Sequence, residues 1–265
     1  MIKNTVILFF LIFYSFNIKS EDSRIILATT TSVNDSGLLE YLNNEFNKEY
    51  NFDIHVISVG TGQALKIAET GNADVVLVHH KPSEIEFIEN GFGVSRYDLM
   101  YNDFIIIGPK NDNKKCINIK KTLIRIKEKK HIFLSRADNS GTHKKEIEIW
   151  ESLDLDINNF GEWYKKIGQG MGMTLMMTNE LSAYTISDRS TWLTFKNKEN
   201  LKIICEYQPP LFNQYGIIAV NPELNSKIRY NLAKKYINWM ISNKGKDLIN
   251  NYKINDEQIF YFNYK

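Results

Sequence analysis

The chain has 265 residues and carries 33 Lys and Arg against 31 Asp and Glu, a formal net charge of only +2 at neutral pH. A balance so close to neutral argues against a nucleic-acid-binding protein, which needs a clustered basic surface. The length is sufficient for one large domain or for two small lobes that each have a hydrophobic core.

The two cysteines, Cys116 and Cys205, lie far apart in the chain. Because there is no CxxC pair and no Cys/His cluster, a structural zinc site is not expected. An oxidising compartment permits a disulfide, but the sequence does not decide whether these two thiols meet, and both outcomes stay open.

The amino terminus has the features of an export signal. Lys3 precedes the apolar run VILFFLIFYSF over residues 6–16, and a polar stretch follows over residues 17–20. The run is too short to span a bilayer, and no stop-transfer segment comes after it. We therefore predict a cleavable signal peptide over residues 1–20 and a free periplasmic protein. An uncleaved membrane anchor is the alternative.

After this segment, short apolar runs alternate with amphipathic stretches. Strands are predicted over residues 25–28, 54–59, 73–78 and 103–108, and helices over 37–50, 63–70 and 82–90. Asp35 or Ser36 is the expected N-cap of the first helix. Buried strands that alternate with helices predict an α/β fold with a parallel sheet covered on both faces.

A second α/β series follows the polar stretch after Pro109. Helices are predicted over residues 120–129, 141–153, 172–181 and 228–243, and strands over 131–135, 183–187, 201–207 and 215–220. We predict two α/β lobes joined by two crossover segments. Residues 21–105 and 212–265 would form one lobe, and residues 106–211 the other. The cleft between the lobes is the expected ligand site.

Three turns share one form, in which hydroxyls and glycines follow a strand and precede a helix. They are residues 29–32 (TTTS), 59–63 (VGTGQ) and 135–143 (SRADNSGTH). Such turns place hydroxyls and free backbone N–H groups at helix N-termini, where anions bind. Each turn alone is also typical of an ordinary cap. Because the first two lie in one predicted lobe and the third in the other, they can face each other.

The donor types favour a particular ligand. A fully deprotonated tetrahedral oxyanion can only accept hydrogen bonds. Hydroxyls, backbone N–H groups and the Arg136 guanidinium supply the donors that such an anion needs. A carboxylate in the site would instead favour a protonated phosphate. We expect Asp138 and Asp188 to be caps, or to orient Arg136 or Arg189.

Several segments together resemble tungstate-binding proteins of the TupA type. They are ATTTSVNDSGLLEYL, VGTGQAL with ADVVLVHHKP, YNDFIIIGP, SRADNSGTHKKE and GQGMGMTLMMTNELSAYTISDRSTWL, spread over residues 28–193. The resemblance implies a type II periplasmic binding protein fold and a non-enzymatic, monomeric receptor. Such a receptor delivers tungstate to an inner-membrane ABC permease, without metal or cofactor. It further implies ligand donors at Thr30 or Thr31, Thr61, Arg136 and Thr142, with Ser140 and Thr174 as additional candidates.

The chain departs from the family pattern at Ala137, at His80 and Lys81, and at Met173 and Met176. None of these differences removes a hydroxyl or the arginine, so oxyanion binding is still expected, whereas the choice between tungstate and molybdate is open. Ala137 places a Cβ in a tight turn.

Two histidine motifs have competing interpretations. His79 and His80 are adjacent on a strand and point to opposite faces, so a surface role is expected rather than a shared metal. His143 is expected to neighbour a cap. The rival readings are a secreted serine hydrolase with Ser140 as nucleophile, for which no GxSxG elbow is present, and a domain of the same fold that has lost its ligand.

Overall fold

The computed structural model describes residues 24–265, so the predicted signal peptide at residues 1–20 lies outside the described residues. The first part of the chain forms β1 (Arg24–Thr30), α1 (Thr31–Asp35), α2 (Leu38–Tyr50), β2 (Asp53–Val59), α3 (Thr61–Glu69), β3 (Val75–Val78), α4 (Lys81–Glu89) and β4 (Gly93–Pro109). The middle part forms α5 (Ile119–Glu128), β5 (Phe133–Ser135), α6 (Gly141–Glu151), a 3-10 turn (Ile157–Asn159), β6 (Tyr164–Lys166), α7 (Met171–Glu180), β7 (Tyr184–Asp188), α8 (Arg189–Thr194) and β8 (Leu201–Cys205).

The last part returns to the elements formed first. It comprises β9 (Phe212–Val220), a 3-10 turn (Pro222–Leu224), α9 (Tyr230–Met240), α10 (Asn243–Asn251) and the short strands β10 (Lys253–Ile254), β11 (Glu257–Gln258) and β12 (Tyr261–Phe262). Within residues 24–265, no helix combines the length and the apolar character needed to cross a membrane.

The strands are hydrogen-bonded in the order β2-β1-β3-β9-β4-β7-β5-β6, with β8 and β12 also paired to β4. Parallel pairs lie at the two ends, where β1 pairs with β2 and β3, and β5 pairs with β6 and β7. The pairs of β9 with β3 and β4, and of β4 with β7, are antiparallel. The expectation of a wholly parallel sheet is therefore wrong in the middle, because β4 and β9 run in opposite directions between the lobes.

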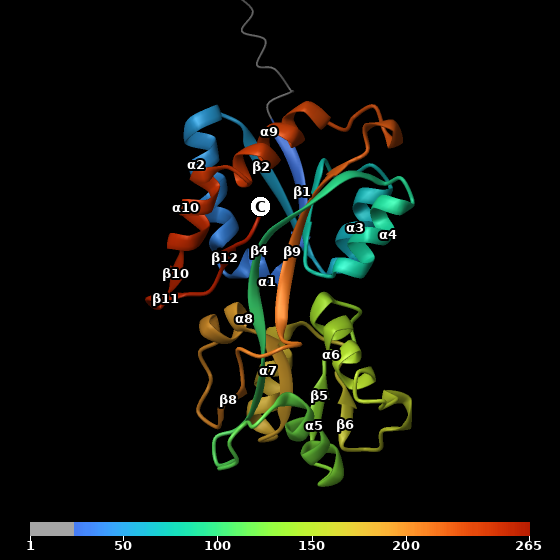
Figure 1. Ribbon diagram of the computed structural model, residues 1–265, viewed down its shortest axis with the longest axis vertical. Coiled ribbons are helices and arrows are strands. Elements are labelled where there is room, and N and C mark those ends of the chain that lie inside the picture. The colour runs from blue at the N-terminus through green and yellow to red at the C-terminus, as the bar shows by residue number, and fades with distance from the viewer. Residues whose placement is uncertain (1–23) are drawn as a thin grey trace, which may run out of the picture.

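Two lobes result (Figure 1). We call first lobe the part built on β1, β2, β3, β9 and the start of β4, and second lobe the part built on β5 to β8 and the end of β4. Strand β4 serves both, because Gly93 to Asp103 pair with β9, whereas Phe104 to Ile107 pair with β7. The two-lobed α/β class is confirmed. The residue boundaries proposed for the lobes stay a prediction.

Each lobe has helices and buried apolar side chains on both faces of its strands. In the first lobe, Phe46 of α2 packs edge-on against Tyr236 and Trp239 of α9, with ring centroids 5.1 and 5.3 Å apart. A separate cluster around Ala64 and Phe87 joins α3 and α4 to the other face. Burying an aromatic side chain of this size stabilises the fold by about 2–3 kcal/mol.

The helices differ from the prediction in several places, and α8 was not predicted at all. An additional short helix, α1, begins at Thr31, and α2 begins after Gly37 rather than after Asp35 or Ser36. Gly37 has φ of 80°, a conformation that glycine adopts without strain. The helix predicted over residues 228–243 is α9, which ends at Met240. Helix α10 was not predicted, and it begins after Ser242, whose hydroxyl accepts a bond from Gly245 N–H and caps it.

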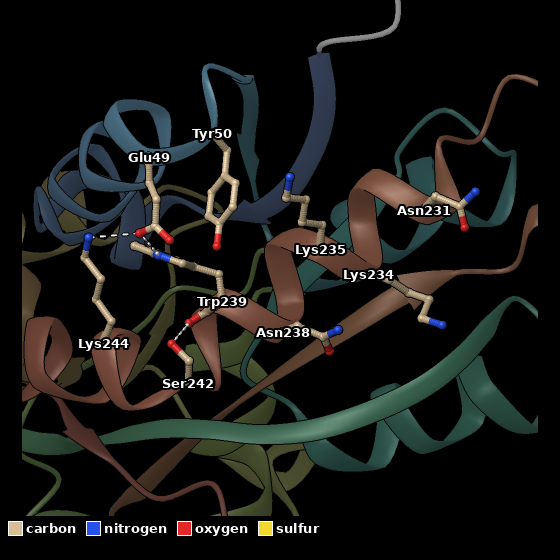
Figure 2. Close-up of a pocket in the computed structure, with 9 residues that line it drawn as sticks. All are labelled: Glu49, Tyr50, Asn231, Lys234, Lys235, Asn238, Trp239, Ser242 and Lys244. Carbon is tan, nitrogen blue, oxygen red and sulfur yellow. Dashed lines mark hydrogen bonds and ion pairs between the residues drawn. The ribbon is translucent and has the colours of Figure 1, made fainter.

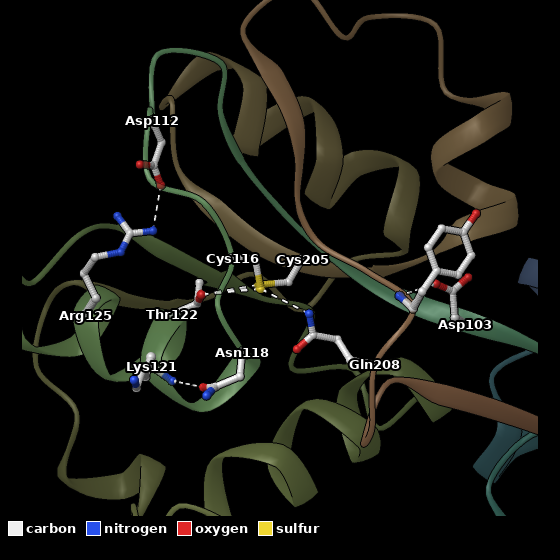
Figure 3. The surroundings of a disulfide bond; sticks show 10 residues. Asp103, Asp112, Cys116, Asn118, Lys121, Thr122, Arg125, Cys205 and Gln208 are labelled. Carbon is white, nitrogen blue, oxygen red and sulfur yellow. Dashed lines mark hydrogen bonds and ion pairs between the residues drawn. A yellow bond between two sulfur atoms is a disulfide. The ribbon is translucent and has the colours of Figure 1, made fainter.

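Cys116 and Cys205 form a disulfide, which settles the question that the sequence left open (Figure 3). The bond joins the segment after β4 to the end of β8, and the hydroxyl of Thr122 on α5 lies 3.3 Å from the Cys205 sulfur. Gln208 Nε2 lies 3.5 Å from the Cys116 sulfur. The bridge therefore fastens α5 to the strands of the second lobe.

Candidate functional site

The predicted turns lie where strands end and helices begin. Strands β1, β2 and β3 end at Thr30, Val59 and Val78. Because β2 and β3 each pair in parallel with β1, these ends lie at one edge of the first lobe. Strand β5 ends at Ser135, before α6, in the second lobe. Both edges therefore present helix N-termini, with their free N–H groups, to the junction of the lobes.

The surroundings of three glycines show how closely the two edges approach each other. A Cβ built on Gly60 would lie 3.7 Å from Ser140 Cα, and one on Gly62 would lie 3.6 Å from Asn139. A Cβ on Gly141, the first residue of α6, would lie only 2.5 Å from His79 Cε1 and 2.8 Å from Thr61 Oγ1. The start of α6 therefore packs against the start of α3 and the end of β3.

Arg136 is the one arginine among the predicted donors, and it is 6% exposed. Asp138 Oδ2 accepts bonds from Arg136 Nε at 3.1 Å and Nη2 at 2.5 Å, and Asp138 Oδ1 accepts a bond from Ser140 N–H at 3.2 Å. Asp138 thus orients the guanidinium, as expected. The turn is tight, since Ala137 and Asn139 have φ of 48° and 60°, which is unusual for residues with a Cβ.

Two of the predicted hydroxyls are buried without hydrogen-bond partners. Thr61 Oγ1 in the first lobe and Thr142 Oγ1 in the second have none among residues 24–265. The two residues are 0% and 2% exposed. Leaving a buried polar group unbonded costs about 1–3 kcal/mol, so a pair of such groups on facing helix starts indicates a place prepared for hydrogen-bond acceptors.

The hydroxyls of the Thr-rich turn at residues 29–32 differ in whether they are used within the fold or remain free to bind a ligand. Thr29 Oγ1 donates to Leu77 O at 2.7 Å and ties β1 to β3. Thr30 Oγ1 lies 3.2 Å from Ser32 Oγ. Thr30 is buried, whereas Thr31 is partly exposed as the first residue of α1. Thr30 therefore lies at the junction of the lobes with its hydroxyl in a polar pair.

The two additional candidates differ in what they can donate. Ser140 Oγ accepts a bond from His143 N–H at 3.2 Å as the N-cap of α6, and its own proton remains available. Thr174 is buried, and its hydroxyl donates to Gly170 O at 3.1 Å within α7. Thr174 is therefore less suited to donate to a ligand.

His143 has the geometry of a cap neighbour. Its Nδ1 accepts a bond from Asn139 N–H at 3.0 Å, and burial lowers its pKa. A serine hydrolase needs that nitrogen to donate to an orienting acid. The arrangement of Ser140 and His143 is a helix cap rather than a nucleophile and base.

His79 is not at the surface, contrary to the expectation. It follows β3 directly and is 7% exposed, with its ring 4.9 Å from that of Tyr215 and 5.9 Å from that of Phe104. Burial lowers the pKa of His79 to about 4, and the charge of Arg136 acts in the same direction. The sequence did contain a signal, because His79 follows a fully apolar strand just as the predicted turns do.

Asp188 caps α8 and does not orient Arg189. Asp188 accepts bonds from Thr191 N–H at 2.8 Å and from the hydroxyls of Ser190 and Thr191 at 2.5 and 2.7 Å. Its two oxygens are therefore occupied by its own helix.

Arg189 instead donates to Asp103 of β4 at 2.6 and 2.8 Å and to Glu206 at 2.7 Å. This network, which the sequence analysis missed, joins α8 to the crossover segments.

A separate hollow of about 610 Å³ lies on the outer side of the first lobe (Figure 2). It is lined by α2 and α9 with the start of α10. Three of its lining residues bond one another, since Lys244 Nζ and Trp239 Nε1 donate to Glu49 at 2.9 and 3.1 Å. These contacts make it part of the packing between helices rather than a prepared site.

Comparisons with known proteins agree with this architecture. Residues 17–244 match the PBP superfamily domain. The tungstate-binding protein TupA of Peptoclostridium acidaminophilum is 48% identical over 233 residues, 86% of this chain and 81% of that protein.

Two solved structures resemble the whole molecule. The tungstate-binding protein TupA from Desulfovibrio alaskensis G20 has a TM-score of 0.81 and 38% identity, over 91% of this chain and 99% of that one. The structure described as the tungstate ABC transporter from Geobacter sulfurreducens has a TM-score of 0.80 and 44% identity, over 87% and 99%. The resemblance predicted from sequence is thus confirmed, and the chain belongs to the TupA family of the PBP superfamily.

Proposed function

We propose that this protein is an extracytoplasmic receptor that captures tungstate between its lobes and delivers it to an ABC permease. The observation that carries the proposal is the pair of buried, unbonded hydroxyls, Thr61 and Thr142, on facing helix starts, with Arg136 in the turn that leads into the second of these helices. The names of the relatives supply the identity of the anion.

The chemistry of the junction suits a fully deprotonated oxyanion. Hydroxyls, helix N–H groups and a guanidinium donate hydrogen bonds, and the oxygens of such an anion only accept them. The two nearby carboxylates are occupied, Asp138 by Arg136 and Asp188 by its own helix. Little acceptor capacity is therefore left to hold a protonated anion.

We assign Thr30, Thr61, Arg136, Ser140 and Thr142 as the ligand donors, with Thr31 as the alternative to Thr30. Donors from the first lobe, such as Thr61, and from the second, such as Thr142, then hold the anion only when the lobes are together. Binding would favour closure for that reason. The protein would act in the periplasm as a monomer and would catalyse no reaction. In its closed form it would dock on an inner-membrane permease.

A thermal-shift titration of residues 21–265 with tungstate, molybdate, sulfate and phosphate tests the proposal. A ligand at a thousandfold excess over its Kd raises stability by about 4 kcal/mol. We expect a large shift with tungstate and none with sulfate or phosphate. Equal shifts with tungstate and molybdate would widen the ligand class to both anions. No shift with either would overturn the function.

A matched pair of variants tests the site. Thr142→Val removes the hydroxyl and keeps the side-chain shape, whereas Thr142→Ser keeps the hydroxyl. Losing one hydrogen bond to a charged ligand costs about 1.5–3 kcal/mol, a ten- to hundredfold rise in Kd. We expect this loss in Thr142→Val but not in Thr142→Ser. Wild-type affinity in both variants would remove Thr142 from the site.

A further inference from the structure

His79 lies among the donors of the proposed site, in the short segment between β3 and α4 rather than in one of the three predicted turns. It follows β3, and its ring stands beside Tyr215 of β9 and Phe104 of β4, the two strands that cross between the lobes. The side chain is thus fixed where the first lobe, the second lobe and the crossovers meet.

Its two ring nitrogens have different surroundings. Nε2 lies 3.5 Å from the hydroxyl of Ser32. Nδ1 is buried and has no hydrogen-bond partner among residues 24–265. A Cβ on Gly141 would lie 2.9 Å from Nδ1 and 2.8 Å from Thr61 Oγ1. Nδ1 and Thr61 Oγ1, both buried and both unbonded, therefore face the same first turn of α6.

We propose that His79 is a ligand-contacting residue whose Nδ1–H donates a hydrogen bond to the bound oxyanion. The proposal rests on the proposed function and adds a donor that the hydroxyl-rich turns do not include. When Ser32 Oγ donates to Nε2, the ring proton must reside on Nδ1, since a neutral imidazole carries one donor and one acceptor. The Ser32 contact is thus compatible with the tautomer that a proton-free anion requires.

The ring acts as a neutral donor. Burial lowers the pKa of His79 to about 4; Arg136 adds to this effect, while Asp188 and Asn213 oppose it. At neutral pH the ring then adds a hydrogen bond without adding charge. A neutral N–H in this position also favours a bare anion oxygen, because a charged oxygen accepts a hydrogen bond more strongly than a hydroxyl oxygen does.

Three substitutions separate this role from simple packing. His79→Asn places an amide nitrogen near the Nδ1 position, His79→Gln places one near the Nε2 position, and His79→Phe keeps a ring without donors. In calorimetric titrations with tungstate, we expect Kd to rise at least about tenfold in His79→Phe and His79→Gln. His79→Asn should stay within about threefold of wild type.

The reverse order, with His79→Gln like wild type and His79→Asn weakened, would overturn the proposal and assign the role to Nε2. Unchanged affinity in His79→Phe would also overturn the proposal, because it would show that neither ring nitrogen contacts the ligand. Melting temperatures without ligand check that each variant folds. If His79→Phe does not fold, the Asn and Gln variants are compared with each other. A higher Kd in His79→Gln than in His79→Asn supports the proposal, and the opposite order overturns it.

Imidazole ¹⁵N resonances of the wild type give a second measure. Tungstate should move the Nδ1 resonance while the ring stays in the Nδ1–H tautomer, and an Nε2–H tautomer in the complex would contradict the proposal. If the wild type itself does not bind tungstate, the proposed function fails, a result distinct from a wild type that binds with His79 uninvolved.

Discussion

Gly141 stands where the two lobes come close together, and its missing side chain is what allows that approach. A Cβ there would meet the His79 ring and the Thr61 hydroxyl at 2.5 and 2.8 Å, both shorter than ordinary contacts. Neither neighbour can easily give way, because both are buried. The glycine is thus required by an interlobe contact rather than by a left-handed backbone.

Gly141→Ala should therefore impair binding without impairing folding. Alanine is favourable in the first turn of a helix, so the melting temperature without ligand should remain within a few degrees of wild type. The lobes, however, should fail to close fully, and the Kd for tungstate should rise about tenfold or more. Gly170→Ala, at the N-cap of α7 where a Cβ meets no atom of residues 24–265 within 4 Å, is the control. Equal affinities in wild type and Gly141→Ala would show that the contact is not needed.

Glu146 gives a prediction for pH. Burial raises the pKa of Glu146 to about 7, although the hydrogen bond from Tyr164 OH, 2.5 Å away, opposes the rise. A carboxyl with a higher pKa in the folded state binds its proton more tightly there. It therefore lowers the free energy of unfolding as pH rises from about 4.5 through about 7.

Glu146→Gln should remove that loss. Relative to wild type, the variant should gain on the order of 1–3 kcal/mol in unfolding free energy between pH 5 and pH 8. Urea unfolding of both proteins at the two pH values measures the difference, and other titrating groups cancel in the comparison. A gain that is the same at both pH values would contradict a raised pKa.

At the scale of single residues, the hydroxyl-rich turns were predictable because a strand end followed by a helix cap is a local sequence pattern. Thr61, Arg136 and Thr142 all lie at the junction where that pattern placed them. His79 was misjudged as a surface residue although it follows an apolar strand as the predicted turns do, and its packing against Tyr215, far along the chain, could not be seen in the local sequence.

At the scale of elements, α4 of the first lobe and α6 of the second are joined by a chain of hydrogen bonds outside the proposed site. Lys144 Nζ donates to Ser83 Oγ at 2.8 Å, and Ser83 Oγ lies 2.7 Å from His80 Nδ1. His80 Nε2 in turn lies 2.9 Å from Glu148 Oε1. This series of hydrogen bonds begins and ends on α6. We call its four residues, Lys144, Ser83, His80 and Glu148, the interlobe clasp.

Weakening the clasp should speed ligand release more than it slows capture, because the bonds exist only when the lobes are together. We expect Glu148→Gln to raise the tungstate dissociation rate about two- to fivefold, a modest effect since Glu148 is partly exposed. Stopped-flow displacement measures the rate. Glu151→Gln, an exposed change on the same helix, should leave it unchanged, and equal rates for both variants would show that the clasp has no role.

The clasp also gives a pH dependence with a definite sign. The hydrogen bond from His80 is the main cause that lowers the pKa of Glu148 below its ordinary value of 4.5. Its contribution to closure is therefore complete above about pH 4.5 and is lost as the pH falls further. The difference in dissociation rate between wild type and Glu148→Gln should shrink in that acidic range.

Helices and strands with apolar periodicity were predicted close to their observed positions, whereas the first half of β4 was not. Residues 93–102 contain polar side chains that look unlike a buried strand. The structure satisfies them in pairs, since Arg96 donates to Glu84 of α4 and to Asp98, both at 2.7 Å. A pattern of hydrophobicity cannot reveal a strand whose charges are neutralised by a different element.

At the scale of the whole molecule, the disulfide closes a loop in which Cys116 and Cys205 are 89 positions apart. A loop of that length is expected to contribute roughly 4 kcal/mol by restricting the unfolded chain. The bridge lies within the second lobe, and neither cysteine belongs to the strand ends and helix starts of the proposed site.

Reduction should therefore lower stability but not affinity. We expect the melting temperature to fall by roughly 10 °C in the reduced protein, with the Kd for tungstate unchanged at 25 °C. The double variant Cys116→Ser, Cys205→Ser should behave in the same way without reductant. A loss of affinity at a temperature where the protein stays folded would show that the bridge also shapes the site.

The two-lobed class followed from the alternation of elements, but the mixed sheet did not. Strand direction in the middle depends on the return of β9 between β3 and β4, and this placement is a property of the whole chain. The disulfide was undecidable for the same reason, because pairing depends on where two distant segments are brought.

The position of β9 also dictates the order in which the molecule can be assembled. Strands β5 to β8 all precede residue 206, so the second lobe has its strands as soon as that part of the chain is available. The first lobe has no such independence, because the strand between β3 and β4 is residues 212–220. A chain truncated before residue 212 would leave β3 and β4 as unpaired edges, which promote aggregation. The receptor can therefore present its junction of lobes only after nearly the whole polypeptide has been made.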